Sequence, residues 1–250
     1  MSDVRRLYAL QVSPWSERAR WALDHHALRY TAVAHMPIVG EWPLRRFLGP
    51  EKKRITVPFL VDDGTAYGDS WEIALHADRT GTGAKLVPSS LEGEVRHWNQ
   101  VADGGMGGVR ARVLARMLDH PKALDASGPA GVPSWLLPLV RPATGWAIRY
   151  LQRKYQTRSD GAATNAMQLR AALDALRDGL KGGKRYLLGQ FTYADIVMAT
   201  LLQGVTPVSD LYWRVAPALR DVWSDESVAR DYGDLLAWRD DVYERHRKPD

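Results

Sequence analysis

Cysteine is absent from the 250 residues of this chain. Disulfide frameworks, zinc fingers, iron–sulfur clusters and a protein thiol nucleophile are therefore excluded. Thiol–disulfide oxidoreductases are excluded with them, because their mixed-disulfide intermediate requires a cysteine. Any thiol chemistry must use a thiol that a small molecule brings to the protein.

Long apolar runs are also lacking. The longest, such as residues 135–140 (WLLPLV), are too short to cross a bilayer, and the N-terminal segment MSDVRRLYAL has no apolar signal-peptide region. We therefore expect a cytoplasmic protein without a membrane partner. A content of 45% hydrophobic and 25% charged residues is typical of a globular protein with one large core or two modest ones.

No dense run of one charge occurs either. The formal net charge is +5, but the tightest basic groups, residues 51–54 (EKKR) and 181–185 (KGGKR), are interrupted by acid or glycine. This pattern favours anionic small ligands over nucleic acid. The seven histidines lack the spacing of metal ligands, so we expect no metal. Dinucleotide, P-loop, G-x-S-x-G and H-E-x-x-H motifs are also missing from the sequence.

What is present begins with a strand and a helix. The apolar run RLYALQV predicts a buried strand, and helical spacing follows from Pro14. Residues 28–35 are rich in β-branched and aromatic side chains and predict a second strand. A short helix is expected around Pro43 to Leu48.

A hairpin and a second helix follow. Two short extended segments flank Asp63-Gly64, a pair that tolerates the positive φ of a hairpin turn. Asp69 and Glu72 then have the spacing of a capping box in front of a helix. The predicted order over residues 6–78 is βαβ, a connector and ββα.

The rest of the chain has helical periodicity. Residues 79–90 have the composition of a linker, and we place a domain boundary near Pro88. Two interruptions are expected after it: residues 125–145, where four prolines argue against a regular helix, and a loop at 158–165.

Three segments in combination resemble the cytosolic glutathione transferase family, in its serine-type bacterial form. They are SPWSERAR after the first strand, VPFLVDDG…GDSWEIALHAD around the hairpin, and YLLGQFTYADIVMA at 186–199. The resemblance spans nearly the whole chain. It implies a thioredoxin-like α/β domain over residues 1–80, which binds glutathione, and an all-α substrate-binding domain over residues 89–250.

Ser13 has two interpretations. Ser followed by Pro is a favoured helix N-cap pair, worth about 1 kcal/mol without any substrate. A helix N-terminus also favours an anion, and a hydroxyl beside it can donate a hydrogen bond to a thiolate. In serine-type family members the hydroxyl at this place in S-P-x-x-x-R stabilises the glutathione thiolate, so the resemblance makes Ser13 the catalytic residue.

Neighbouring residues receive lesser roles. Tyr8 is the rival catalytic hydroxyl, but its place within the strand favours a core or hinge role. Ser16 is interpreted as a helix-surface or secondary contact. Arg18 and Arg20, two apart, point to different faces of the helix and are interpreted as solvated or salt-bridged surface.

Val57-Pro58 is the second candidate site. A proline that opens a strand needs no donor there, and its peptide bond is either trans or cis, which sequence alone does not decide. By resemblance, Pro58 is the cis-proline of the thioredoxin-like fold. Val57 would then pair through its backbone with the cysteinyl part of glutathione.

Asp69-Ser70 is the third. The residue pattern alone predicts a helix cap. By resemblance, the pair holds the γ-glutamyl end of glutathione, with Ser70 facing the carboxylate and Asp69 facing the ammonium group. Both interpretations can be true, because a helix cap whose hydrogen-bond donors are only partly used can exchange bound water for a ligand carboxylate. Arg54 and Arg46 are candidates for the glycyl carboxylate.

The resemblance implies an enzyme that ionises the glutathione thiol for attack on a small apolar electrophile in detoxification, and a homodimer. Three alternatives stay open: a glutathione-dependent β-etherase, an isomerase, or a non-catalytic binding protein on the same fold. FTYADI, with Thr192 and Asp195 as a capping box and Phe191 with Ile196 as a hydrophobic staple, is assigned to folding.

Overall fold

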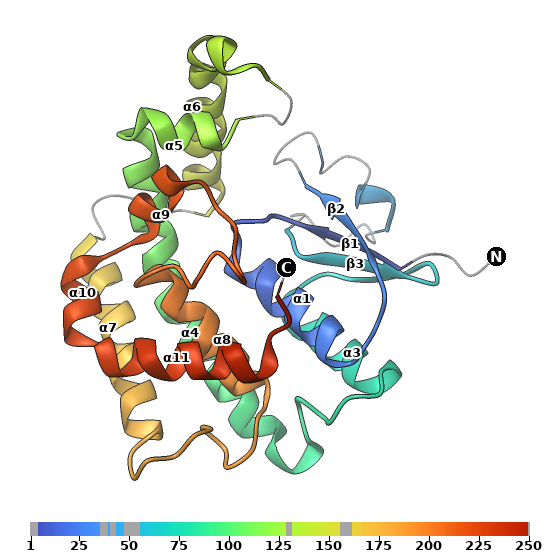
Figure 1. Cartoon of the computed structure of the whole chain (residues 1–250). Helices are drawn as coiled ribbons and strands as arrows, with labels where there is room; N and C mark the ends of the chain where they lie inside the picture. The colour runs from blue at the N-terminus through green and yellow to red at the C-terminus, as the bar shows by residue number, and fades with distance from the viewer. Residues whose placement is uncertain are drawn as a thin grey trace. The chain divides into compact units, whose positions relative to one another are not determined.

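The computed structural model describes residues 5–35, 40, 44–47, 56–128, 132–155 and 162–249, apart from the side chains of Arg46 and Ala162 (Figure 1). The chain forms two compact units. The first comprises residues 1–99, 184–200 and 241–249, and the second comprises residues 100–183 and 201–240. The domain limits of 1–80 and 89–250 stay a prediction.

The first unit contains a four-stranded mixed sheet in the order β2-β1-β3-β4. Its strands are β1 (Arg6–Ala9), β2 (Thr31–Ala34), β3 (Phe59–Asp62) and β4 (Thr65–Tyr67). β1 runs parallel to β2 and antiparallel to β3, and β3 is antiparallel to β4. The parallel pair requires a crossover, which α1 (Pro14–His25) supplies.

The predicted hairpin is confirmed between β3 and β4. Asp63 and Gly64 have φ of 46° and 74°. Two successive positive φ values are those of a turn that matches the strand twist and favours Asp-Gly. The predicted helix after it is α3 (Ser70–Thr80), which packs against α1.

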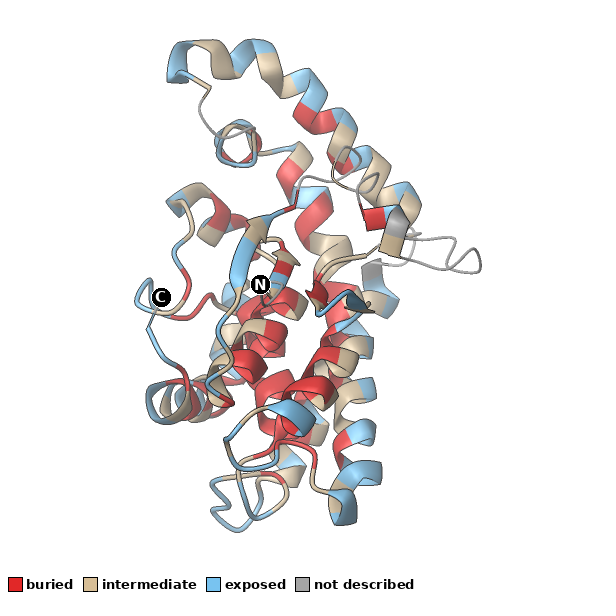
Figure 2. Cartoon of the chain, turned by 90° about the vertical axis from the view of Figure 1, so that its right-hand side faces the viewer, coloured by how far each residue is buried: buried red, intermediate tan, exposed pale blue. Residues whose placement is uncertain are grey.

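The core of the α/β part consists of fully buried apolar residues. Buried residues are coloured red on the ribbon in Figure 2. Leu7 and Leu60 come from the sheet, and Trp21, Leu23 and Ile73 from the two helices. A smaller cluster consists of Leu44, which directly precedes the 3-10 turn η1 (Arg45–Phe47), and of Phe59 and Val61 on β3. Such burial contributes about 1.5–3 kcal/mol for each large apolar side chain.

All regular elements after β4 in the described residues are helical. They are α3, η2 (Ser89–Leu91), α4 (Glu92–Leu118), α5 (Pro121–Ala126), η3 (Ser134–Leu136), α6 (Leu137–Lys154), α7 (Ala162–Gly179), α8 (Tyr193–Leu201), η5 (Leu202–Gly204), α9 (Pro217–Trp223), α10 (Glu226–Asp231) and α11 (Gly233–His246). The predicted order of domains, an α/β part followed by a helical part, is confirmed.

Two expectations about the helical part were wrong. The prolines of residues 125–145 do not prevent a regular helix, since α6 runs through Pro138 and Pro142. Pro138 lies in the first turn, where no backbone donor is needed, and Pro142 is exposed, so its ring is accommodated without disturbing a packed face. Residues 162–165, expected to belong to a loop at 158–165, lie in α7, and the rest of that range lies outside the described residues.

The segment predicted to be a linker is held in place on the first unit. α3 continues to Thr80, Leu86 is fully buried, and Val87 is 8% exposed. The backbone N–H groups of Leu86 and Val87 donate to the Asp78 carboxylate. The Gly, Ser and Pro content that suggested a linker between domains therefore belongs to a chain segment fixed by hydrogen bonds.

Candidate active site at one end of the sheet

The register of the sheet brings the three predicted site elements to one end of it. Tyr8 near the end of β1 pairs with Phe59 at the start of β3, and Leu60 pairs with Tyr67 at the end of β4. The chain therefore leaves β1 toward Ser13, enters β3 from Val57-Pro58 and leaves β4 toward Asp69-Ser70 at the same end. Both α1 and α3 begin there, so two helix N-termini lie at this end of the sheet.

Ser13 is the N-cap of α1. Its backbone is extended, with φ −96° and ψ 120°, and its Oγ accepts a hydrogen bond from Ser16 N at 3.4 Å. Pro14 occupies the first helical position. Ser13 is half-buried. Because a hydroxyl has one donor and two acceptor positions, capping leaves the O–H of Ser13 available for an anion.

Ser16 is fully buried, so the helix-surface interpretation was wrong, and the alternative of a secondary contact stays a prediction. Its Oγ accepts from Leu10 N at 3.1 Å, while its own N–H caps onto Ser13. The side chain therefore fixes the turn between β1 and α1 from the inside. A serine three residues after an N-cap carries no sequence signal for this role.

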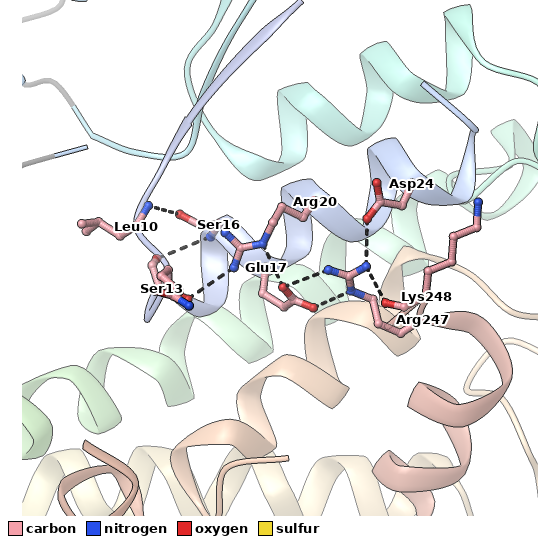
Figure 3. A network of polar contacts seen from close by, with 9 residues as sticks. Leu10, Ser13, Ser16, Glu17, Arg20, Asp24, Arg247 and Lys248 are labelled. Atoms are coloured by element: carbon pink, nitrogen blue, oxygen red, sulfur yellow. Dashed lines mark hydrogen bonds and ion pairs between the residues drawn. The ribbon is translucent and has the colours of Figure 1, made fainter. Parts of the chain in front are cut away.

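A buried ion-pair network adjoins this turn (Figure 3). Arg247 Nε lies 2.6 Å from Glu17 Oε1, and both side chains are 2% exposed. Arg247 Nη1 lies 2.8 Å from Asp24 Oδ2, and Arg20 Nε lies 3.1 Å from Glu17 Oε2. Burial raises the pKa of Asp24, and the charge of Arg247 acts against that rise.

The network was missed in the sequence, although Arg20 was correctly expected to be surface or salt-bridged. A Glu in the first turn of a helix is common, because its negative charge stabilises the positive end of the helix dipole. Glu17 therefore gave no sign of a buried ion pair. Arg247 lies 230 residues away and carries no motif. Arg18, interpreted as surface, is fully buried and donates from Nε to Thr200 Oγ1 at 2.9 Å.

Val57-Pro58 has the cis peptide bond that the resemblance implied. Pro58 is buried, and the half-buried Val57 packs against the cluster of Leu44, Phe59 and Val61. Tyr8 packs on the same cluster, with its ring 6.4 Å from that of Phe59 in an edge arrangement. A core role for Tyr8 agrees with this packing.

Asp69 caps α3. Its Oδ1 accepts from Glu72 N at 2.8 Å, while Glu72 Oε2 accepts from Gly68 N at 2.7 Å, one residue earlier than in the usual capping box. Asp69 is exposed, whereas Ser70, the first residue of α3, is only 4% exposed. The Asp69 carboxylate is therefore open to a cationic group, whereas the Ser70 hydroxyl is nearly closed to solvent.

The remaining candidates have other outcomes. Arg54 and the side chain of Arg46 lie outside the described residues. Asp195 accepts from the N–H groups of Leu187 and Thr192, both at 2.9 Å, and the bond from Thr192 N is the Asp195 half of the predicted capping box. Burial raises the pKa of Asp195 to about 6 against the lowering effect of these hydrogen bonds.

In the part of the chain that the structure describes, no group of three His, Asp or Glu side chains is placed to hold a metal ion. None of its helices combines the length and the hydropathy needed to span a bilayer.

Comparison with protein families identifies this arrangement. A model described as the N-terminal domain of glutathione S-transferase matches residues 7–84, and one described as the C-terminal domain of glutathione S-transferase matches residues 159–241. Together they cover more than half of the chain. The chain belongs to the glutathione S-transferase family. Its thioredoxin-like α/β part and helical part are those of this family.

Solved structures share the fold of this family member. A glutathione transferase from Phanerochaete chrysosporium has a TM-score of 0.65 at 17% identity and covers 100% of both chains. A glutathione S-transferase from Methylobacillus flagellatus, solved with glutathione bound, has a TM-score of 0.60 at 18% identity over 98% of this chain and 100% of that chain.

A β-etherase from Sphingobium sp. strain SYK-6 is also similar, with a TM-score of 0.63 at 16% identity over 96% of this chain and 95% of that chain. Sequence comparison with curated proteins finds no match to this family member.

Proposed function

We propose that this chain is a glutathione transferase in which Ser13 stabilises the thiolate of bound glutathione for attack on an electrophilic carbon. The observation that carries the proposal is the register of the sheet, which directs Ser13, Val57-Pro58 and Asp69-Ser70 to the end where α1 and α3 begin. Family membership and the relative from Methylobacillus flagellatus with glutathione bound support it.

The chemistry required of the site is ionisation of a thiol. A free thiol has a pKa near 8.5, so only a few per cent is thiolate at neutral pH. The N-terminus of α1 carries roughly half a positive charge, and the O–H of Ser13 adds a hydrogen bond to an anion held there. Each unit by which the thiol pKa falls is worth about 1.4 kcal/mol of differential stabilisation.

In the proposed reaction the thiolate sulfur forms a bond to the electrophilic carbon. The bond from that carbon to the leaving group breaks, and the leaving group departs with the electron pair and takes up a proton from solvent. The thiol proton goes to solvent when the thiolate forms. No cysteine of the protein takes part, since the chain has none.

The rest of the tripeptide is assigned along the same end of the sheet. We propose that the backbone of Val57, held by Pro58, pairs with the cysteinyl part. Asp69 faces the γ-glutamyl ammonium group, and the start of α3 at Ser70 receives its carboxylate. Arg54 is proposed for the glycyl carboxylate on the resemblance alone.

A second candidate function is glutathione-dependent ether cleavage, favoured by the similarity to the β-etherase from Sphingobium. The thiolate would attack the carbon that bears the aryl ether, the C–O bond would break, and the aryl oxide would leave and take up a proton. The two functions share the thiolate step and differ in the electrophile. A panel of aryl halides and aryl ethers distinguishes them by which substrate consumes glutathione.

Finer properties of the family complete the proposal. We propose a cytoplasmic homodimer that detoxifies small apolar electrophiles. Sedimentation at low protein concentration tests the dimer, since the chain alone has a mass of 28.0 kDa. A single species of that mass would contradict it.

The test of Ser13 is a titration of bound glutathione, followed by thiolate absorbance, in three proteins. The wild type should lower the thiol pKa by one unit or more, and Ser13→Ala should lose most of that shift. Ser13→Gly is the control for capping, because Gly is tolerated at an N-cap at a cost of a few tenths of a kcal/mol but has no hydroxyl to donate and adds no charge. Equal thiol pKa values in all three proteins would make Ser13 a cap only.

A further inference from the structure

The buried pair of Arg247 and Glu17 lies one helical turn from Ser13. Glu17 N donates to Ser13 O at 3.0 Å, so Glu17 belongs to the first turn of the helix that Ser13 caps. Its carboxylate receives Arg247 Nε at 2.6 Å and Nη2 at 3.4 Å. One turn corresponds to about 5.4 Å along the axis, well within the range at which charges interact in a protein.

The network also reaches the turn itself. Arg20 Nε binds Glu17 Oε2 at 3.1 Å, and Arg20 Nη2 donates to Gln11 O at 3.3 Å, two residues before Ser13 (Figure 3). Arg247, Glu17 and Arg20 therefore form a continuous chain of ion pairs from the C-terminal segment to the loop that carries Ser13.

The side chains that pair directly in this network carry equal numbers of positive and negative charges. The charged and titratable groups around Glu17 come from α1, the segment after it and the C-terminal segment: Arg20, Asp24, Tyr30, Arg247 and Lys248. Two carboxylates are thus held by two guanidinium groups. Removing one member leaves a net charge in a region that solvent screens poorly, because Glu17 and Arg247 are each 2% exposed.

We propose that Arg247 neutralises the buried Glu17 carboxylate in the first turn of α1 and so keeps that carboxylate from opposing ionisation of the thiol bound beside Ser13. This rests on the proposed function. Arg247 is a positioning residue, since it acts through Glu17 and touches no reacting atom. A negative charge left on Glu17 would oppose a thiolate at the helix N-terminus, whereas a positive charge left on Arg247 would favour it.

The test is the thiol pKa of bound glutathione in three variants. Arg247→Met keeps an unbranched apolar stem but removes the charge, and should raise the thiol pKa by roughly half a unit to one unit. Glu17→Gln should lower it by a similar amount. The double variant should return close to the wild-type value, because both charges are gone. A shift of opposite sign in the two single variants is a result that simple loss of packing does not produce.

Two controls separate this effect from stability. Arg247→Lys keeps the positive charge and should leave the thiol pKa near that of the wild type. Arg245→Met removes an exposed arginine on the same helix end, paired with Asp241 at 2.8 Å, and should change nothing. If Arg247→Met does not fold, Glu17→Gln still shows whether the thiol pKa falls, and the double variant still shows whether it returns to the wild-type value.

Failure of this inference is distinguishable from failure of the proposed function. A wild type that lowers the thiol pKa, with single variants that leave it unchanged or move it in one direction, would overturn the role of Arg247 and leave the transferase intact. A wild type that binds glutathione without lowering its thiol pKa, or does not bind it, would overturn both.

Discussion

His26 Nε2 lies 2.6 Å from Asp78 Oδ1, and both side chains are buried. His26 is the residue after α1, and Asp78 lies on α3, so the pair joins the two helices that begin at the proposed site. The same carboxylate receives the backbone N–H groups of Leu86 at 2.9 Å and Val87 at 2.7 Å. One carboxylate thus fixes both helices and the segment that follows them.

Asp78→Asn should destabilise the protein by about 1–3 kcal/mol. The amide offers one acceptor oxygen where the carboxylate offers two, so at least one buried donor loses its partner. Urea unfolding measures the difference. Asp63→Asn, in the exposed hairpin turn, is the matched control and should be near neutral, because Asn also tolerates positive φ. Equal unfolding midpoints for the two variants would contradict the anchoring role.

Asp195 predicts a change of stability with pH. Burial raises its folded pKa to about 6, above the ordinary aspartate value of 3.8, so the folded state binds the proton more tightly than the unfolded state. This carboxyl therefore stabilises the protein increasingly as pH falls from 7 to 5, by about 1 kcal/mol.

The comparison that isolates this effect is wild type against Asp195→Asn, unfolded in urea at pH 7 and pH 5. Burial lowers the pKa values of His25 and His246, which destabilises the folded state over the same range, so the wild type alone is not diagnostic. The disadvantage of Asp195→Asn should be larger at pH 5. A disadvantage that shrinks on acidification would show that Asp195 does not have a raised pKa.

Pro142 of α6 is expected to cost stability. It lies inside the helix, where its missing N–H removes a backbone hydrogen bond, and it is exposed. Pro142→Ala should stabilise the protein by about 1–3 kcal/mol. Pro138→Ala, in the first turn of the same helix, should change stability little. Thermal unfolding of both variants tests this, and an equal response would mean that α6 is not regular at Pro142.

Two glycines in the helical part should respond to alanine with opposite signs. A Cβ at Gly204 would come within 2.4 Å of the Val109 side chain, while one at Gly107 in α4 would meet no atom within 4 Å. Gly204→Ala should destabilise the protein by about 1–3 kcal/mol through overpacking. Gly107→Ala should stabilise it by about 0.5–1 kcal/mol, because glycine weakens a helix interior. Chemical unfolding that ranks them the other way would contradict the packing at η5.

Features set by neighbouring residues could be predicted from the sequence. The Asp63-Gly64 turn depends on the backbone freedom of two adjacent residues, and the caps at Ser13 and Asp69 depend on hydrogen bonds within three residues. The Thr192 and Asp195 box is equally local. The order of elements followed from these signals. The three segments of the proposed site came instead from the family resemblance, and the register of the sheet brings them to one end.

Features set by distant partners could not be predicted. Arg18 is indistinguishable in sequence from a surface arginine, and its burial depends on Thr200, 182 residues later. The pair of Glu17 and Arg247 depends on a contact of the same kind. The path of α6 through Pro142 was missed because propensity opposes it, and the surrounding helix overrides that propensity.

We propose that the glutathione sulfur becomes anionic where α1 begins, and a crystal structure with bound glutathione is the decisive experiment. The sulfur is expected within hydrogen-bonding reach of Ser13 Oγ, about 3–3.5 Å, with the γ-glutamyl end at the start of α3. A sulfur well away from that hydroxyl, or glutathione bound elsewhere on the protein, would contradict it.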